Sequence, residues 1–224
     1  MALQVLSKAE LLASLAEEIL HNYGKGRAIV AVDGLDGAGK TRFADALAAQ
    51  LGVGHRAVFR ASIDDFHWPR ARRYARGRDS AEGFYRDSFD YTTFKRVLVE
   101  PFRTGSIGSF VLQGFDLKRD VPFQPKWSSG PEDALLIVDG IFLNRPELKG
   151  LWNYSIWLEV DAEVAAARVI ARDAEEFEHD IANPERYIGG QALYLQEAKP
   201  LEAATAIVDN NDFEHPKRVF ADSC

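Results

Sequence analysis

An eight-residue pattern near the N-terminus constrains the fold more than any other feature of this sequence. The segment Gly34–Thr41 has the spacing Gly-x-x-x-x-Gly-Lys-Thr, which is typical of a phosphate-binding loop (P-loop). Before it stands the short apolar run Ala28–Val32, which favours a buried parallel strand, and residues 41–51 favour a helix. A strand, a glycine-rich loop and a helix in this order predict a P-loop nucleotide-binding domain.

Each part of this loop has a physical role in holding a triphosphate. Glycines let backbone N–H groups turn towards phosphate oxygens, and the helix that follows adds the positive end of its dipole. The Lys40 ammonium can reach the β- and γ-phosphates and act in catalysis, and the Thr41 hydroxyl can be a Mg²⁺ ligand. We therefore expect ATP and Mg²⁺ to be bound by the loop residues Gly34, Asp36, Gly37, Ala38, Gly39, Lys40 and Thr41.

Segments typical of strands and helices alternate along the chain. Further strands are expected at Ala57–Ser62, Ala134–Val138, Tyr154–Val160 and Ala204–Val208. Helices are expected at residues 7–22, 41–51, 162–174 and 185–197. This alternation predicts an α/β fold with a mainly parallel sheet, helices on both faces, and one domain over residues 1–224.

The middle of the chain, at about residues 66–130, differs from the rest in composition. It is rich in arginine, aromatic, glycine and proline residues and has no clear periodicity. We interpret it as an insertion on the acceptor side of the site, with a small hairpin around Ser109–Leu117. Such an irregular stretch in a chain of this size favours a small-molecule kinase.

Charge and cysteine content narrow the partners and the cellular location. The net charge of −7 argues against a general nucleic-acid binder, which usually carries a basic excess. The sole cysteine is Cys224, and neither a signal peptide nor a long apolar span is evident. We expect a cytoplasmic protein with a small-molecule acceptor and with no nucleic-acid or membrane partner. Homo-oligomerisation is left open.

Acidic residues stand at the ends of two expected strands. Asp64 and Asp65 come directly after the second strand, and Asp139 ends the run Leu136-Ile137-Val138. A carboxylate at such a position can take a proton from an acceptor hydroxyl or hold Mg²⁺. Adjacent side chains diverge, so we expect only one of Asp64 and Asp65 to face the ligand. Helix caps and tight turns are the alternative roles for all three residues.

Five arginines lie within nine residues shortly after these acids: Arg70, Arg72, Arg73, Arg76 and Arg78. Such a run is either a solvated face or a site for a phosphorylated or carboxylated acceptor, because arginine binds these groups in a bidentate way. We assign Arg72 and Arg73 as candidate acceptor ligands.

Four motifs together resemble one known family. The P-loop, then Ser62–His67, then Phe89-Asp90-Tyr91, then Val138–Ile141 are similar to motifs of the uridine kinase and phosphoribulokinase group of P-loop kinases. The resemblance covers roughly residues 27–210 and is tight only in these short blocks. Tyr187–Gln191 and Val208–Asp212 are similar to uridine-kinase-like bacterial proteins.

The resemblance implies a role for each matching residue. It makes Asp64 the catalytic base, and it makes Thr41, Asp64 and Asp139 the Mg²⁺ ligands. Arg168 and Arg172 would contact the nucleotide from the helix that leads into a lid at about residues 168–190. The acceptor residues implied by the family motifs are Asp64, His67, Asp90, Phe115 and Asp116. In the lid itself, the stretch Ala174–Asp180 is acidic where uridine kinases carry arginines.

The implied activity is phosphoryl transfer from ATP to a hydroxyl of a small metabolite, with a nucleoside similar to uridine favoured. A sugar, a sugar phosphate and a pantothenate-like compound are alternative acceptors. The P-loop by itself is also compatible with a non-catalytic regulatory module and with a nucleotide hydrolase. A guanine-specific Asn-Lys-x-Asp motif is absent from the sequence, which favours ATP over GTP.

Overall fold

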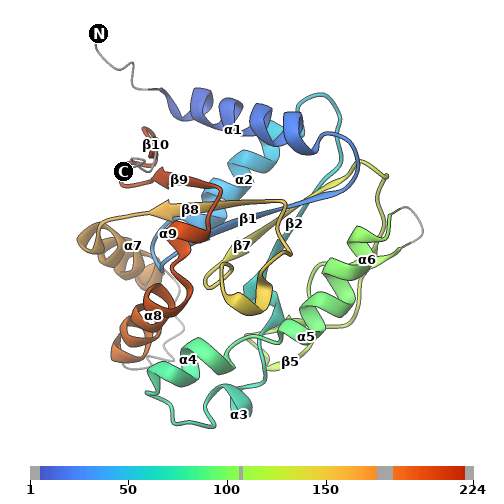
Figure 1. Ribbon diagram of the computed structural model, residues 1–224. Helices are drawn as coiled ribbons and strands as arrows, with labels where there is room; N and C mark the ends of the chain where they lie inside the picture. Colours follow the sequence, from blue (N-terminus) through green and yellow to red (C-terminus); the bar gives the residue numbers. More distant parts are fainter. Residues whose placement is uncertain (1–5, 106–107, 176–183, 220–224) are drawn as a thin grey trace.

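The computed structural model describes residues 6–105, 108–175 and 184–219. Its centre is a six-stranded sheet with the strand order β10-β9-β8-β1-β7-β2. The strands are β1 Ala28–Gly34, β2 Val58–Ser62, β7 Leu135–Gly140, β8 Tyr154–Glu159, β9 Ala206–Asp209 and β10 Lys217–Val219. β10 pairs antiparallel with β9 at one edge, and all other pairs are parallel (Figure 1).

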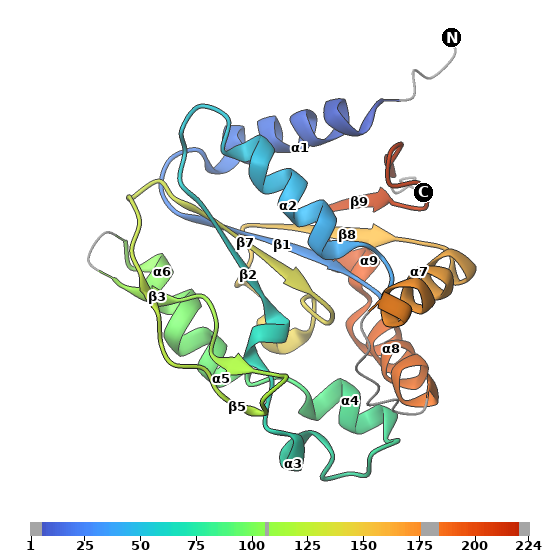
Figure 2. The ribbon, with the colours of Figure 1, turned by 180° about the vertical axis from the view of Figure 1, so that it is seen from behind.

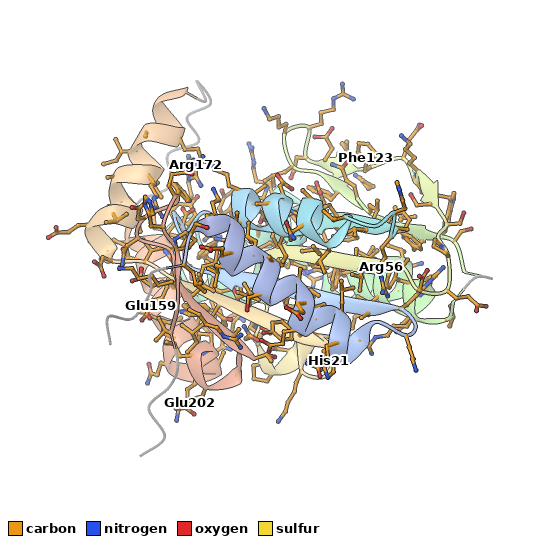
Figure 3. The ribbon with its side chains drawn as sticks, turned by 90° about the horizontal axis from the view of Figure 1, so that it is seen from above. His21, Arg56, Phe123, Glu159, Arg172 and Glu202 are labelled. Atoms are coloured by element: carbon orange, nitrogen blue, oxygen red, sulfur yellow. The ribbon has the colours of Figure 1, made fainter. Side chains whose placement is uncertain are left out.

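Helices pack on both faces of this sheet. On one face α1 Lys8–Tyr23 and α2 Lys40–Leu51 lie across the strands and enclose an apolar core with alternate residues of β1 (Figures 2 and 3). The other face carries α4 Ala81–Asp87, α5 Tyr91–Phe94, α6 Glu100–Arg103, α8 Pro184–Ala198 and α9 Pro200–Ala203. Because both of its faces are covered, β1 is buried throughout, which explains its continuous apolar run.

The remaining helical elements border the sheet at its carboxyl edge. α7 Ala162–Glu175 follows β8, and α3 Arg70–Arg73 follows a 3-10 turn at Ile63–Phe66 that continues β2. A π-helical turn at Lys95–Val99 joins α5 to α6, and a 3-10 turn at Pro146–Leu148 follows β7. No helix in the described part of the chain is long and apolar enough to cross a membrane.

The predicted α/β fold with a mainly parallel sheet is confirmed. Every strand and helix expected outside the middle stretch forms, with ends displaced by at most two residues. The first helix begins with Ser7 and Glu10, which exchange hydrogen bonds between side chain and backbone as a capping box. β10 was not expected, because three residues at a sheet edge carry too little pattern to be recognised.

The expected hairpin around Ser109–Leu117 is wrong. β3 Phe110–Val111 pairs with β6 Trp127–Ser128, whereas β4 Phe115–Asp116 pairs with β5 Val121–Pro122. Aromatic packing explains the difference, since the Phe110 ring centre lies 5.0 Å from that of Phe59 and 5.3 Å from that of Phe102. These edge contacts hold β3 against the core, away from β4.

Candidate functional site

The P-loop joins β1 to α2 with a backbone that needs glycine at two positions. Gly37 and Gly39 have φ angles of 75° and 82°, in the left-handed region that other residues avoid. A Cβ at Gly37 would also lie 2.4 Å from the backbone oxygen of Ala165. Lys40 is the first residue of α2, and its Nζ donates to the Leu35 carbonyl at 2.8 Å. The ammonium group therefore curls back over the loop, where a phosphate anion would meet it.

The rim of the loop is held by two helices. The Asp36 N–H donates to Oε1 of Gln191 on α8 at 2.9 Å, and Asp36 Oδ1 accepts from Arg172 on α7 at 2.9 Å (Figure 3 locates Arg172). Burial by itself would raise the pKa of Asp36, but the Arg172 hydrogen bond and the nearby Lys40 ammonium outweigh it and lower the pKa. Asp36 therefore stays ionised and fixes Arg172 beside the loop.

Arg168 is committed to backbone oxygens. Its guanidinium donates to the carbonyls of Asn210 and Asn211 at 3.0 and 2.9 Å, and to that of Gly37 at 3.4 Å. The same guanidinium lies 3.7 Å from the ring centre of Phe213. Arg168 thus ties the loop after β9 to the P-loop, and direct contact with phosphate stays a prediction for this residue and for Arg172.

The loop after β9 contributes a second contact to the P-loop. Buried Asn210 donates from Nδ2 to the Ala38 carbonyl at 2.8 Å, and Phe213 packs so closely that a Cβ at Gly39 would lie 2.2 Å from its ring.

The lid expected at about residues 168–190 begins in α7 and ends in α8. Its acidic middle lies outside the described residues.

Thr41 and Asp139 meet beside the loop. The Thr41 hydroxyl donates to Asp139 Oδ2 at 2.7 Å, and Asp139 is buried at 2% exposure. Arg60 of β2 donates from Nη2 to the other carboxylate oxygen, Oδ1, at 2.9 Å. Arg60 was missed in the sequence, although its place in a strand before Asp64 was a signal. Its charge compensates the buried carboxylate and fixes its direction.

The Thr41–Asp139 pair fits Mg²⁺ by the chemistry of its donors. Both groups offer hard oxygen atoms, and no three His, Cys, Asp or Glu side chains converge as a metal site within the described residues. Mg²⁺ usually takes one or two carboxylates from the protein and completes its shell with phosphate oxygens and water. The arrangement therefore suits a metal that arrives with a nucleotide.

Asp64 and Asp65 lie on the 3-10 turn directly after β2, and their side chains have different surroundings. Asp64 is exposed, and its N–H is capped by Ser62 Oγ at 3.2 Å. Asp65 is partly buried, and burial with the charges of Asp64 and Asp139 raises its pKa to about 6. The structure thus places Asp65 near Asp64 and Asp139, and the expectation that only one of the two adjacent carboxylates faces a ligand stays a prediction. Asp64 stays the predicted base.

His67 and Asp90 border the same turn. His67 Nδ1 makes a hydrogen bond with the Asp64 carbonyl at 2.7 Å, and its ring packs at a tilt of 51° against Phe89, with centres 4.5 Å apart. Burial lowers the pKa of His67, so the imidazole is neutral at pH 7. Asp90 caps α5 by accepting from the Thr93 N–H at 3.0 Å. Contact of either residue with an acceptor stays a prediction.

Phe115 and Asp116 lie on β4, which runs beside this turn. The neighbouring Gly114 N–H donates to the Asp65 carbonyl at 2.9 Å, and Phe115 is buried. Asp116 accepts from the Arg119 N–H at 3.0 Å, a contact of the β4–β5 hairpin. The structure therefore places the Phe115 backbone near the site and engages Asp116 in a turn.

Arg72, Arg73 and Arg76 of the arginine cluster differ in their contacts. Arg73 donates to the Trp68 carbonyl at 2.8 Å and to Asp120 at 3.3 Å, and Arg76 binds Asp87 at 2.7 Å. Arg72 instead stacks on Trp68, with its guanidinium carbon 3.4 Å from the ring centre. Among the described residues no carboxylate pairs with Arg72, so its charge is available to a ligand.

A buried carboxylate behind the P-loop was missed in the sequence. Asp33 at the end of β1 accepts from the Gly34 N–H at 2.8 Å, from Nδ2 of Asn144 at 2.8 Å, and from the hydroxyl of Tyr194 on α8. Burial raises the pKa of Asp33, and this effect outweighs the hydrogen bonds, which by themselves would lower the pKa. An acid that ends a fully apolar strand was the available signal. Asp33 joins the start of the loop to α8.

Comparisons with known proteins agree on the fold. No protein-family model matches the sequence, and no curated protein matches it either. A solved structure from Bacillus stearothermophilus, described as a "possible uridine kinase", aligns with a TM-score of 0.68 and 21% identity over 88% of this chain and 96% of its own. A protein of Silicibacter sp. TM1040, provisionally described as a fructose transport system kinase, aligns with a TM-score of 0.63 and 26% identity over 86% and 94%.

A third structure extends this agreement. D-glycerate 3-kinase from Cryptococcus neoformans aligns with a TM-score of 0.64 and 10% identity over 94% of this chain and 99% of its own. The chain therefore has the fold of P-loop kinases, and the predicted resemblance to uridine-kinase-like proteins is confirmed at the level of the fold.

Proposed function

We propose that this protein transfers the γ-phosphoryl group of ATP, bound with Mg²⁺, to a hydroxyl group of a small metabolite. One observation carries the proposal: the phosphate-binding loop, Asp139 and the Asp64 turn meet at one edge of the sheet. In the sheet register Asp139 lies beside Val32 of β1 and beside Ser62 of β2, so the three strand ends are neighbours. Ligands of open parallel sheets bind at this carboxyl edge.

In the proposed reaction each of these residues has a separate role. The loop N–H groups and Lys40 hold the phosphates, and Thr41 with Asp139 holds Mg²⁺, which would neutralise phosphate charge when bound. Asp64 accepts the proton of the acceptor hydroxyl. The acceptor oxygen then bonds to the γ-phosphorus as the bond from that phosphorus to the bridging oxygen breaks, which leaves ADP and the phosphorylated metabolite.

A nucleoside is the favoured acceptor, because the residue motifs are most similar to those of uridine kinases and a structural neighbour is described as a possible uridine kinase. Sugar, sugar-phosphate, glycerate and pantothenate-like acceptors are the alternatives, and two neighbours are described as kinases of fructose transport and of D-glycerate.

The test is a metabolite screen that measures ADP release in the presence of Mg-ATP. The panel contains uridine, cytidine, simple sugars, ribulose phosphate, glycerate and pantothenate. We expect one class to accelerate ADP release strongly above the acceptor-free rate. Slow hydrolysis that ignores every acceptor would identify a hydrolase, and tight ATP binding without turnover would identify a regulatory module.

Nucleotide binding should depend on Mg²⁺. Thr41 and Asp139 offer oxygen ligands beside the loop, and without the metal the Asp139 carboxylate adds negative charge near the phosphates. Calorimetric titration of ATP with Mg²⁺ and then with excess EDTA should show clearly weaker binding in EDTA. Equal affinity and equal activity under both conditions would contradict the metal assignment.

Arg72 should act on an anionic acceptor. If the acceptor found in the screen carries a phosphate or carboxylate, Arg72→Gln should raise its KM by roughly tenfold or more and leave the KM of ATP nearly unchanged, as expected for one lost hydrogen bond to a charged group. Arg76→Gln is the matched control, because Asp87 already pairs with that charge. An unchanged acceptor KM in Arg72→Gln, or an equal rise in both variants, would show that Arg72 is a solvated surface residue and not a ligand of the acceptor.

A further inference from the structure

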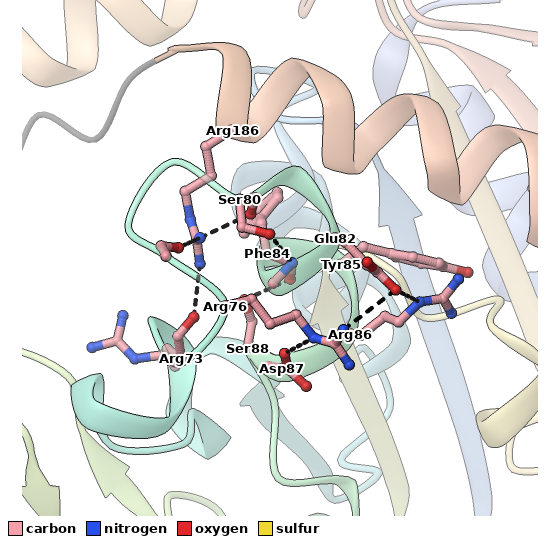
Figure 4. Close-up of polar contacts among 12 residues, drawn as sticks. Arg73, Arg76, Ser80, Glu82, Phe84, Tyr85, Arg86, Asp87, Ser88 and Arg186 are labelled. Carbon is pink, nitrogen blue, oxygen red and sulfur yellow. Dashed lines mark hydrogen bonds and ion pairs between the residues drawn. The ribbon is translucent and has the colours of Figure 1, made fainter.

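Arg186 is a buried arginine whose partners are backbone oxygens. It lies on α8 with 2% exposure, and its guanidinium donates to carbonyls of the arginine-rich segment, defined here as residues 70–80 (Figure 4). The four accepting residues are Arg73 at 3.2 Å, Gly77 at 3.5 Å, Arg78 at 3.1 Å and Ser80 at 2.9 Å. One side chain thus binds the backbone of the segment at four residues between Arg73 and Ser80.

This arrangement decides the shape of the arginine-rich segment. Beyond the single turn of α3 its backbone has no regular hydrogen-bond ladder, and Gly77 adopts a φ of 104°. Carbonyls in such a loop need donors when they are buried, and a guanidinium offers five N–H groups in a rigid plane. A lysine would offer a single point charge without this fork.

The helix that carries Arg186 is seated directly on the neighbouring helix α4. A Cβ at Gly189 would lie 2.6 Å from that of Ala81, and a Cβ at Gly190 would lie 2.5 Å from the ring of Phe84. The two glycines therefore allow close backbone contact. α8 has a defined position against the segment that leads from Arg76 to Asp87.

The same helix also contacts the phosphate-binding loop. Gln191 Oε1 accepts from the Asp36 N–H at 2.9 Å, and the Tyr194 hydroxyl donates to buried Asp33. Gln191 follows Arg186 by only five residues, a helical rise of about 7.5 Å. One rigid element therefore holds both the loop for phosphates and the segment with the candidate acceptor residue Arg72.

We propose that α8 couples the P-loop to the arginine-rich segment, with Arg186 as the positioning residue, so that nucleotide at the loop orders residues 70–80. The proposal rests on the proposed function only in requiring that the loop binds nucleotide. A bound nucleotide restrains Asp36, Gln191 transmits the restraint to α8, and Arg186 transmits it to the carbonyls of the segment. By thermodynamic linkage, an acceptor that orders the segment should in turn tighten nucleotide binding.

Trypsin provides a direct probe, because the segment itself contains five arginines. We would measure the rate of cleavage after Arg70, Arg72, Arg73, Arg76 and Arg78 by mass spectrometry, with and without Mg²⁺ and the non-hydrolysable analogue AMP-PNP. In the wild-type protein the analogue should slow cleavage at least about fivefold, the lower end of typical coupling between sites. In Arg186→Gln the segment should be cleaved faster without ligand, and AMP-PNP should no longer protect it.

Two further variants separate coupling from stability. Arg103→Gln is the matched control, since Arg103 on α6 also donates to two backbone carbonyls, those of Gly150 and Leu151. It should behave as the wild type. Gln191→Ala keeps the Arg186 contacts and breaks the contact with Asp36, so the segment should stay intact without ligand and lose protection by AMP-PNP. If Arg186→Gln fails to fold, Gln191→Ala still tests whether α8 couples the P-loop to the arginine-rich segment.

Equal protection by AMP-PNP in the wild type, Arg186→Gln and Gln191→Ala would overturn the coupling. Faster cleavage spread over the whole chain of Arg186→Gln, with protection of the segment retained, would reduce Arg186 to a purely stabilising residue. Calorimetry distinguishes these results from failure of the proposed function: absence of AMP-PNP binding to the wild type would contradict both proposals, whereas binding without protection would contradict the coupling alone.

Discussion

Replacement of Asp64 by asparagine should lower kcat by roughly 10²–10⁴-fold, the usual range for a lost general base. Asparagine keeps the shape of the side chain and can still form a hydrogen bond, but it cannot accept the proton of the acceptor hydroxyl. Asp64 is exposed at the end of β2, and no described cation forms an ion pair with its side chain. The fold should therefore tolerate the change. Steady-state kinetics with the acceptor found in the screen, together with the melting temperature, would measure both effects.

Asp65→Asn is the matched control for this prediction. The Asp65 carboxylate is partly buried and its pKa is raised to about 6, a value that would itself suit a base at pH 7. The choice of Asp64 rests on its exposure to an incoming acceptor and on the family resemblance. Replacement of Asp65 should change kcat far less than Asp64→Asn does. A larger loss in Asp65→Asn would move the base to Asp65. If Asp64→Asn abolished ATP binding and spared turnover at saturation, Asp64 would belong to the metal site.

Lys40→Ala should leave a folded protein whose turnover is lower by about a hundredfold or more. The ammonium donates a hydrogen bond to the Leu35 carbonyl and lies near the carboxylates of Asp33 and Asp36, so its removal changes the local charge but leaves no gap in the apolar core. The substitution removes a positive charge from the place where negative charge develops on the transferred phosphoryl group. Preorganised electrostatic contacts of this kind contribute about a hundredfold or more to the rate.

The control for Lys40→Ala is Lys95→Ala. Lys95 is also a lysine whose ammonium donates to a single backbone carbonyl, that of Glu147, at an exposed position. Both variants should melt close to the wild type, and only Lys40→Ala should lose turnover in a coupled ADP assay. Near-normal turnover of Lys40→Ala would remove the kinase interpretation of the loop.

The central part of the fold could be predicted because its signals are local. The apolar run of β1, the glycines with positive φ and the helix start at Lys40 follow one another within about a dozen residues, as the structure confirms. The placement of Asp64 and Asp139 at neighbouring strand ends follows from the geometry of any parallel sheet. The fold class, and the convergence of the candidate site residues at one edge of the sheet, therefore follow from sequence.

The middle stretch was less predictable because its elements are short. α3, α5 and α6 have four residues each and α4 has seven, which is too few for a helical period to be recognised. Four strands of two residues follow; β3 and β4 each bury a phenylalanine, Phe110 and Phe115, and the more exposed strands β5 and β6 pair with them. Tertiary packing, and not local preference, selects these elements.

The sequence by itself determined that this chain forms a P-loop in a parallel α/β sheet, since those features depend on neighbouring residues. Only the tertiary structure decided what each arginine binds. Arg60 meets a carboxylate 79 residues away, and Arg186 meets a carbonyl 113 residues away. A long cationic side chain pairs equally well with a carboxylate, a carbonyl or a bound anion. Its partner therefore depends on which oxygen the folded chain brings within about 3 Å, and no local pattern contains that information.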